Sequence, residues 1–435
     1  MTRLPDRADR RTVLRTTAGL ASLPTLAGCL GGGSDDGDES DREDGSDGDD
    51  DDGSGGGGGD SEGPDGGDDV EYEVERVAEE FEHPWGLAFL PDDGRLLVTE
   101  RPGRLSLVDP ADGAVEEVAG APEVHAEGQG GLLDVAVHPE FPDDARVYLT
   151  YAATNDAGES ATHVGSGRLS LGDGGGAHAL DGFEALRAAG PFVDSDQHFG
   201  SRATFGPDGA LFVTVGDRRD TDFDADHVSQ DRSNELGSTL RLTPDGDPHP
   251  DNPFVDDADG ADALYSYGHR NPQAMAVRPE TGAIWQCEHG EEDGDEINVI
   301  ERGGNYGWPI ASEACQYGTD DPVAPAHDER DDVVAPVHYW PCGSGGFPPS
   351  GAVFYDGDAF PEWRGDLFAG TLAAEYLGRF TVDGAGIDDA TVTERDPLLA
   401  DRGWRVRALA VELATGHLYV AVDAADAPVV RIVPA

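Results

Sequence analysis

The stretch YSYGHRNPQAMAV (265–277) places a histidine, an arginine and an asparagine side by side in a run that otherwise suits a β-strand. Successive strand residues face opposite sides of a sheet, so Arg270 and Asn271 cannot both point into one apolar core. Pro272 removes a ladder donor and biases Asn271 toward an extended or turn conformation. The row offers an imidazole, which can move a proton, and a cation, which can stabilise developing negative charge. We therefore expect it to lie at the rim of a cleft.

Four further polar clusters lie between apolar runs and could meet the first at the same cleft. They are QHFGSR (197–202), GDRRDTD (216–222), EHGEEDGDEIN (288–298) and GGNYGWP (303–309). A fold that brings the loops between its strands to one mouth would gather all five clusters there.

The elements that must position these clusters form a repeated unit, in which an apolar strand, a turn with Pro, Asp or Gly and a second apolar strand follow one another. About six copies occur, at a spacing of roughly 45–80 residues that suits four-stranded blades around an axis. The copies are GLAFLPDDGRLLVTE (86–100), DVAVHPEFPDDARVYLTY (134–151), RATFGPDGALFVTVGD (202–217), AMAVRPETGAIWQCEHG (274–290), SGAVFYDGDAFPEWRGDLFAGT (350–371) and RALAVELATGHLYVAVD (407–423). The pattern predicts an all-β, six-bladed β-propeller over about residues 71–435, with an array of β-sandwiches as the alternative. Only residues 181–190 suit a short helix.

The chain is strongly acidic, with a formal net charge of −60, and all 29 of its basic residues are arginine. The acidic excess extends well beyond the N-terminal run into the domain. A surface of this charge repels nucleic acid and anionic lipid head groups, so we expect no nucleic-acid partner. We interpret it as an adaptation to very high salt, in which self-repulsion is screened over about 3 Å at 1 M. A patch for one basic partner, the alternative, would concentrate the charge.

The N-terminus has the pattern of an export signal. Arg10 and Arg11 precede a short apolar stretch (residues 16–28), as in twin-arginine signals. The stretch is too short to span a bilayer comfortably. It ends in the letters LAGC, which are typical of a lipobox, so we expect Cys29 to receive a lipid after cleavage. A lone buried cysteine is the alternative.

These features divide the chain into a signal peptide (1–29), an acidic Gly/Asp-rich tether (30–70) and a catalytic domain (71–435). The tether has too few apolar residues to form a core. We expect an exported protein on the outer face of the cytoplasmic membrane, which it touches only through the lipid on Cys29.

Three cysteines remain in the domain. An exported protein can hold a disulfide. The loop-like, Gly- and Pro-rich surroundings of Cys315 and Cys342 favour that pair, although the spacing leaves pairings with Cys287 open.

Six motifs follow one another in order across most of residues 84–410. They are GQGGLLDVAVHPEF, HFGSR, YSYGHRNPQ, EHGEEDGDEIN, GGNYGWP and WRVRAL. Each alone is weak, but the ordered set resembles the soluble quinoprotein sugar dehydrogenases, especially the aldose sugar dehydrogenase branch of the glucose/sorbosone dehydrogenase family. The resemblance implies pyrroloquinoline quinone (PQQ) and a calcium ion, both bound over the channel of a propeller.

The resemblance also assigns catalytic roles. Oxidation of an aldose at its anomeric carbon needs a base for the hydroxyl proton and an acceptor for the hydride. It implies that His198 of HFGSR is the base and that Arg270 donates to the quinone oxygen where negative charge grows. It further implies that Asn271 orients the cofactor ring and that Gln129 of GQGG contacts it. The alternatives are a His198 that only satisfies local backbone groups and an Arg270 paired with a surface acid.

PQQ carries three carboxylates and needs cationic partners. Arg405 and Arg407 match the family's paired arginines, and they point to one side if the backbone there is extended. Many quinoprotein glucose dehydrogenases add a lysine near GTLAAEYLGRF, where this chain has Ala373. That departure favours the aldose dehydrogenase branch.

The EHGEEDGDEIN stretch resembles the family's calcium loop. The resemblance implies that the carbonyls of Gly290 and Glu291 bind the ion, with Asp295 and Glu296 as supporting acids. The family commonly has proline where this chain has Glu291. Acidic clusters also arise by chance in so acidic a chain. Trp340 could stack on the substrate or cofactor, or pack within a blade.

The expected activity is therefore PQQ- and calcium-dependent oxidation of an aldose to an aldonolactone, with an extracytoplasmic protein or quinone as electron acceptor. One alternative is a related propeller without PQQ that binds a sugar or protein. A calcium-dependent lactonase is another, because propellers of one architecture support different functions.

Lowering the salt from about 1 M to about 0.1 M should reduce the melting temperature of the domain. The Debye length grows from about 3 Å to about 10 Å, so acidic side chains repel one another over longer distances. Thermal unfolding of the protein without residues 1–29, followed by circular dichroism across a salt series, measures the change. An unaltered melting temperature would show that the acidity serves another purpose.

Overall fold

The computed structural model describes residues 70–91, 93–172 and 176–435. The predicted signal peptide, Cys29 and the tether up to residue 69 lie outside these residues. Within the described part, no helix is long and apolar enough to cross a membrane. Its elements are β-strands and three single-turn 3-10 helices, which confirms the prediction of an all-β chain.

Four of the sheets are antiparallel and four-stranded, and one of them joins the two ends of the domain. That sheet consists of β1 (Tyr72–Phe81), β24 (Ala427–Pro434), β23 (His417–Val422) and β22 (Val406–Glu412). The second consists of β10 (Ala203–Phe205), β11 (Leu211–Val215), β12 (Ser238–Leu242) and β13 (Leu264–Tyr267). The third consists of β14 (Asn271–Val277), β15 (Ile284–His289), β16 (Glu296–Val299) and β17 (His338–Tyr339). The fourth consists of β18 (Pro349–Phe354), β19 (Leu367–Thr371), β20 (Leu377–Asp383) and β21 (Thr391–Glu394).

The fifth sheet has eight strands in the order β2-β3-β4-β5-β9-β8-β7-β6. They are β2 (Pro84–Phe89), β3 (Leu96–Glu100), β4 (Arg104–Asp109), β5 (Ala114–Ala119), β9 (His178–Ala188), β8 (Ser160–Ser170), β7 (Arg146–Thr154) and β6 (Leu132–Val137). The contact between β5 and β9 is parallel and pairs only Val118 with His178 and Ala119 with Ala179. All other neighbours in this sheet are antiparallel.

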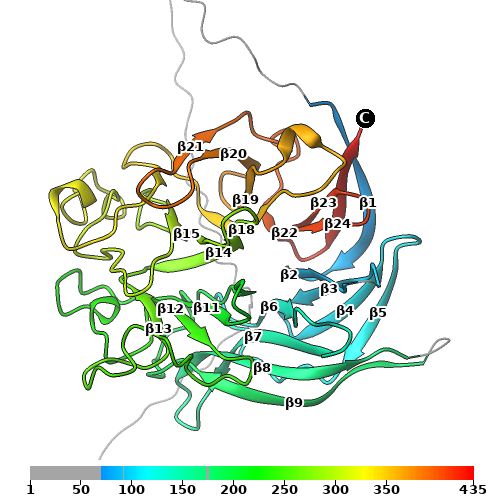
Figure 1. Ribbon diagram of the computed structural model, residues 1–435, viewed down its shortest axis with the longest axis horizontal. Helices are drawn as coiled ribbons and strands as arrows, with labels where there is room; N and C mark the ends of the chain where they lie inside the picture. The colour runs from blue at the N-terminus through cyan, green and yellow to red at the C-terminus, as the bar shows by residue number, and fades with distance from the viewer. Residues whose placement is uncertain (1–69, 92, 173–175) are drawn as a thin grey trace, which may run out of the picture. The chain divides into compact units, whose positions relative to one another are not determined.

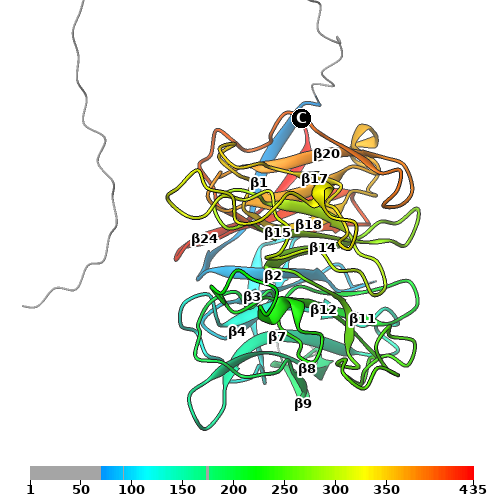
Figure 2. The same ribbon diagram turned by 90° about the vertical axis from the view of Figure 1, so that its left-hand side faces the viewer.

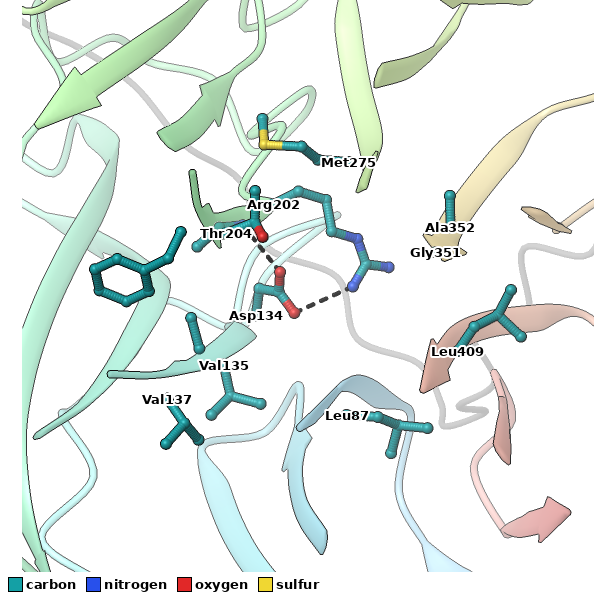
Figure 3. Close-up of a pocket in the computed structure, with 13 residues that line it drawn as sticks. Leu87, Asp134, Val135, Val137, Arg202, Thr204, Met275, Gly351, Ala352 and Leu409 are labelled. Atoms are coloured by element: carbon teal, nitrogen blue, oxygen red, sulfur yellow. Dashed lines mark hydrogen bonds and ion pairs between the residues drawn. The ribbon is translucent and has the colours of Figure 1, made fainter. Parts of the chain in front are cut away.

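The strands β2, β6, β10, β14, β18 and β22 touch one another in a closed ring. In both views β2, β14 and β18 lie near the middle of the described domain, whereas β9 and β20 lie at its periphery (Figures 1 and 2). All six strands of the ring contribute residues to one cavity of about 310 Å³, which we call the axial cavity (Figure 3). The apolar cores lie between neighbouring sheets, as sheet faces bury their hydrophobic residues against one another.

The helix expected over residues 181–190 is wrong, because most of this segment belongs to β9. Its backbone pairs with β8 from Ala179 to Ala188, with irregularities in the ladder near Gly182. The helix-favouring composition is overridden because a β8 strand of eleven residues provides a full set of hydrogen-bond partners.

The predicted disulfide between Cys315 and Cys342 is present, with 5.2 Å between the two Cα atoms. Cys287 is a free, buried thiol on β15. The bridge closes a loop of the third sheet, between β16 and β18.

A buried guanidinium ties the ring of inner strands together. Arg202 pairs with Asp134 of β6, with 3.2 Å between Nη1 and Oδ1 (Figure 3). Its nitrogens also donate to three main-chain carbonyls, those of Trp85, Gln273 and Arg407, at 3.3, 2.6 and 2.8 Å. The second Asp134 oxygen accepts from the backbone of Ala203 at 2.9 Å. One ion pair thus connects β2, β6, β10, β14 and β22.

Each of these two charges depends on the other. Burial raises the pKa of Asp134 and lowers that of Arg202 to about 10, because both charged forms lose their hydration. Asp134→Asn should therefore leave an uncompensated buried cation and lower the free energy of unfolding by about 3–5 kcal/mol. Chemical denaturation in constant molar salt measures this.

Glu75→Gln provides the matched control, since it breaks the exposed pair between Glu75 and Arg431. Exposed pairs contribute about 0–1 kcal/mol. An Asp134→Asn variant as stable as this control would contradict a central role for the buried pair.

Candidate active site

A second cavity, of about 450 Å³, is lined by Trp85, Gln273 and Arg407, whose carbonyls accept from Arg202; we call it the polar cavity. The two are neighbours because Arg202 lines the axial cavity, while the residues whose carbonyls it holds line the polar one. All eight predicted site residues line the polar cavity: Gln129, His198, Arg270, Asn271, Gly290, Glu291, Arg405 and Arg407. Of the five polar clusters expected to meet at one cleft, QHFGSR, GHRNPQ and EHGEEDGDEIN line this cavity, whereas GDRRDTD and GGNYGWP contribute none of its lining residues.

His198 lies in the loop before β10, where its backbone has a positive φ of 46°. Its Nδ1 is 2.7 Å from Oδ1 of Asp217, and both side chains are buried. Burial lowers the pKa of His198, and although Asp217 opposes this, the cation of Arg270 adds to it. The imidazole is therefore neutral at neutral pH.

Asp217 fixes which nitrogen of that imidazole is free. Burial tends to raise the pKa of Asp217, but the neighbouring His198 and, after it, the cation of Arg270 lower this pKa on balance. The ionised carboxylate can only accept, so Nδ1 carries the proton and Nε2 keeps a lone pair. Among the described residues Nε2 has no hydrogen-bond partner, and His198 lines the cavity. This is the arrangement of a general base held by an acid.

Asp217 was not among the predicted site residues, although it lies in the GDRRDTD cluster. Its Oδ2 accepts from the indole of Trp308 at 2.9 Å, and its Oδ1 accepts from the backbone of Arg219 at 2.8 Å. The available signal was its place directly after the apolar strand β11. That signal is weak in a chain with 89 acidic residues.

Three side chains hold the His198 loop. Gln129 accepts from the backbone of His198 at 2.9 Å, and Asn271 accepts from that of Gly200 at 3.2 Å. Arg218 donates to the carbonyls of Gln197 and Ser160 at 2.8 and 3.1 Å, with its guanidinium 3.7 Å from the centre of the Phe199 ring. Gln129 and Asn271 thus position the loop in addition to lining the cavity.

Arg270 is buried and forms an ion pair with the carboxylate of Glu291. Its guanidinium also lies 5.3 Å from the ring of Trp308, and its backbone donates to Glu288 at 2.8 Å. The acid that pairs with Arg270 is thus a cavity residue, whose side chain the sequence reading left without a role.

Three more arginines form a cationic wall of the cavity. Arg407 donates to Gln273 at 2.9 Å and to Asp423 at 2.6 Å. Arg405 approaches Asp423 only at 4.0 Å, and its side chain is 45% exposed. Both guanidinium groups line the cavity, as expected from their spacing.

Arg101, which sequence reasoning missed, is the third. Its Nε donates to the carbonyl of Gly130 at 3.1 Å, and its Nη2 donates to that of Gly128. Burial lowers its pKa, with the cation of Arg407 acting in the same direction.

Asp423 also lines the cavity and forms an ion pair with Arg407. Burial would raise its pKa, but the charge and hydrogen bond of Arg407, followed by His83 and Arg405, lower it to about 2. Asp423 therefore stays ionised and orients Arg407 toward Gln273 and the cavity.

The predicted calcium loop closes another side of the cavity. Asp295 accepts from the backbones of Gly290 and Phe347 at 3.1 and 2.7 Å, and burial raises its pKa to about 6. A Cβ at Gly290 would lie 1.9 Å from the carbonyl oxygen of Asp293, so only glycine fits there. No hydrogen bond of the described residues uses the carbonyls of Gly290 or Glu291.

The described residues contain no group of three or more His, Cys, Asp or Glu side chains placed to hold a metal ion. A cation site here would therefore rest on main-chain carbonyls. Glu296 faces a small adjoining cavity instead, together with Glu288. Trp340 stacks on Phe347, with 4.4 Å between ring centres, which matches its interpretation as a packed aromatic.

The polar cavity fits a rigid organic anion such as PQQ. Its volume lies within the range of about 300–1,000 Å³ for small-molecule sites. Arg101, Arg405 and Arg407 suit carboxylates. Two of the residues that line the cavity also have a buried nitrogen without a partner among the described residues, Nε of Arg407 and Nε2 of His289, and a bound ligand with donors and acceptors would pair with them.

Comparison with known proteins agrees with the sequence resemblance. The family model of glucose/sorbosone dehydrogenases matches residues 81–431. Aldose sugar dehydrogenase YliI of Escherichia coli K12 is 36% identical over 366 residues, which cover 83% of this chain and 92% of that protein. A crystal structure of a glucose dehydrogenase is 39% identical with a TM-score of 0.75, over 82% of this chain and 99% of that one.

The PQQ-bound form of an aldose sugar dehydrogenase from Streptomyces coelicolor is more distant. It is 27% identical with a TM-score of 0.64, over 84% of this chain and 98% of that one. The match to the family model spans almost the whole described domain, including every residue that lines the polar cavity. The chain belongs to the glucose/sorbosone dehydrogenase family.

Proposed function

We propose that this protein oxidises an aldose at its anomeric carbon to the aldonolactone, with PQQ and calcium as cofactors. The observation that carries the proposal is that one cavity contains both a neutral histidine and four arginines. The histidine is His198, which Asp217 holds through a hydrogen bond. A module that only binds a sugar needs no buried base.

The reaction removes two electrons and two protons from the sugar, as a hydride from C1 and a proton from its hydroxyl group. His198 Nε2 takes the hydroxyl proton, and Asp217 stabilises the resulting imidazolium across their 2.7 Å hydrogen bond. PQQ, when bound, supplies the acceptor for the hydride. Arg270 places a fixed positive charge beside this exchange in a cavity with restricted access to water.

The chain's own residues divide the work of holding the cofactors. Arg101, Arg405 and Arg407 would hold the carboxylates of PQQ, and Arg270 and Asn271 its ring system. The carbonyls of Gly290 and Glu291 would hold calcium, which prefers oxygen ligands. Glu291 then has two roles, since its carboxylate also pairs with Arg270.

We also infer a six-bladed propeller. The parallel contact of two residue pairs between β5 and β9 divides the eight-stranded sheet into two groups of four. With the other four sheets this makes six groups, each contributing one strand to the closed inner ring. Propellers place ligands over such a ring.

The proposed location of the protein in the cell rests on the sequence alone. We propose an exported lipoprotein, anchored through Cys29 and a flexible tether, that passes electrons to an extracytoplasmic protein or quinone. The lactonase alternative is less well supported, because it gives no role to the arginines that line the cavity. The PQQ-free binding alternative remains the competing proposal for the test below.

Purified protein in molar salt should reduce a dye with an aldose only after PQQ and calcium are added. The chain itself provides the proposed base, His198, and the arginines, but the group that accepts the hydride must come from the cofactor. Dye reduction with a panel of aldoses, with and without each cofactor, measures this. Inactivity with every sugar, in a protein that remains folded, would favour the binding alternative.

His198→Ala and Arg405→Ala should fail in different ways. Loss of the base should lower kcat by roughly 10²–10⁴-fold and leave PQQ affinity nearly intact. Arg405 is half exposed and belongs to a different loop from His198. Its loss should weaken PQQ binding, so that an excess of PQQ restores turnover.

Turnover and equilibrium PQQ binding, both measured against PQQ concentration, separate the two cases. Arg395→Ala is the control, because Arg395 does not line the polar cavity. Turnover by His198→Ala at the wild-type rate would remove it as the base.

A further inference from the structure

Tyr317 is an exposed aromatic residue at the edge of the polar cavity. Its relative exposure is 59%, and it is one of four large hydrophobic residues exposed in the described domain, with Val115, Tyr339 and Leu413. Of these four, only Tyr317 lines the polar cavity. None of the roles assigned so far uses it.

The backbone holds Tyr317 in place. It follows Gln316, whose carbonyl accepts from Thr319 at 3.0 Å, so Tyr317 and Gly318 form the tip of a turn. Gly318 has a positive φ of 73°, which this position of a tight turn requires.

The base of the same turn is fixed to the predicted calcium loop. Cys315 exchanges two backbone hydrogen bonds with Glu292, at 3.1 and 3.0 Å, and its side chain forms the disulfide to Cys342. The Glu292 carboxylate also accepts from the backbone of Gly318. An exposed tyrosine on so restrained a loop loses little conformational entropy when a ligand binds to it.

The cavity wall beside Tyr317 differs in charge from the arginine wall. Glu292 and Asp293 line it, and each has one carboxylate oxygen with no hydrogen bond among the described residues. An acidic wall repels carboxylates but can accept hydrogen bonds from hydroxyl groups. An aromatic face beside it can pack on the apolar C–H face of a ring. Together these features suit a neutral polyhydroxylated ring.

We propose that Tyr317, with Glu292 and Asp293, forms the sugar-binding side of the polar cavity, and that Tyr317 sets the affinity for the aldose. The proposal deepens the function proposed above and rests on it. The arginine wall receives the anionic cofactor, and the restrained turn that carries Tyr317 presents an aromatic surface to the substrate.

Tyr317→Ala tests the proposal in the PQQ- and calcium-loaded protein. We expect the KM for D-glucose to rise roughly 3- to 10-fold, the effect of losing one aromatic contact, while kcat stays within about twofold. Tyr317→Phe should keep the wild-type KM, because the ring rather than its hydroxyl group makes the contact. Equilibrium dialysis with 1-deoxy-D-glucose, which has no anomeric hydroxyl to oxidise, should show the same loss of affinity.

Tyr339→Ala is the matched control. Tyr339 is a tyrosine of similar exposure, 44%, on the chain segment enclosed by the same disulfide, but it does not line the polar cavity. Its replacement should change neither the KM nor the dialysis result. Circular dichroism checks that each variant is folded.

The outcomes separate this inference from the proposed function. An active protein whose Tyr317→Ala variant binds both sugars as the wild type does would overturn the inference alone. A raised KM for the dye with an unchanged KM for glucose would also overturn it, assigning Tyr317 to the electron acceptor. An inactive wild-type protein that loses 1-deoxy-D-glucose binding on Tyr317→Ala would refute the dehydrogenase proposal and support the sugar site. A wild-type protein that oxidises no aldose of the panel and does not bind 1-deoxy-D-glucose would overturn both.

Discussion

The described domain depends on a buried charge at the centre of its ring of inner strands. Arg202 reaches Asp134 and the carbonyls of Trp85, Gln273 and Arg407, so strands far apart in the sequence are held at fixed distances. Buried charges need such a complete set of partners. Because the last three residues also line the polar cavity, the interaction that closes the ring also forms the floor of the site.

The site shows how a highly acidic protein keeps a cationic cavity. Carbonyl oxygens, rather than carboxylates, accept the hydrogen bonds of Arg101 in this cavity. Carbonyls orient a guanidinium without cancelling its charge, so the positive potential remains available to an anion. Arg270 and Arg407 are counterexamples, since Glu291 and Asp423 pair with them, but Arg407 keeps one nitrogen without a partner. Local geometry therefore decides the chemistry here, whereas the net charge governs the outer surface.

Sequence patterns predicted the all-β class, the disulfide and the meeting of eight site residues, because strand periodicity and ordered motifs are local signals. These local patterns could not predict contacts between segments that are far apart in the sequence. Asp217 could not be distinguished from other acids until β11 and the His198 loop were seen together, and the ion pair of Arg270 with Glu291 required the fold. The helix expected near Gly182 was wrong for a related reason, since pairing with β8 decides the structure of that segment.

The pair of Arg270 and Glu291 links the two walls of the cavity. Arg270 lies near His198, where its charge helps to lower the pKa of the imidazole that we propose as the base. Glu291 belongs to the acidic loop, next to Glu292, whose backbone and carboxylate hold the turn of Tyr317. The side chain of Glu291 therefore restrains the cation that we propose at the reacting centre. Through its neighbour Glu292 it also lies beside the turn proposed to receive the sugar. A proline at this position would keep the main-chain carbonyl but release Arg270, so the glutamate makes the position of that cation depend on the acidic loop.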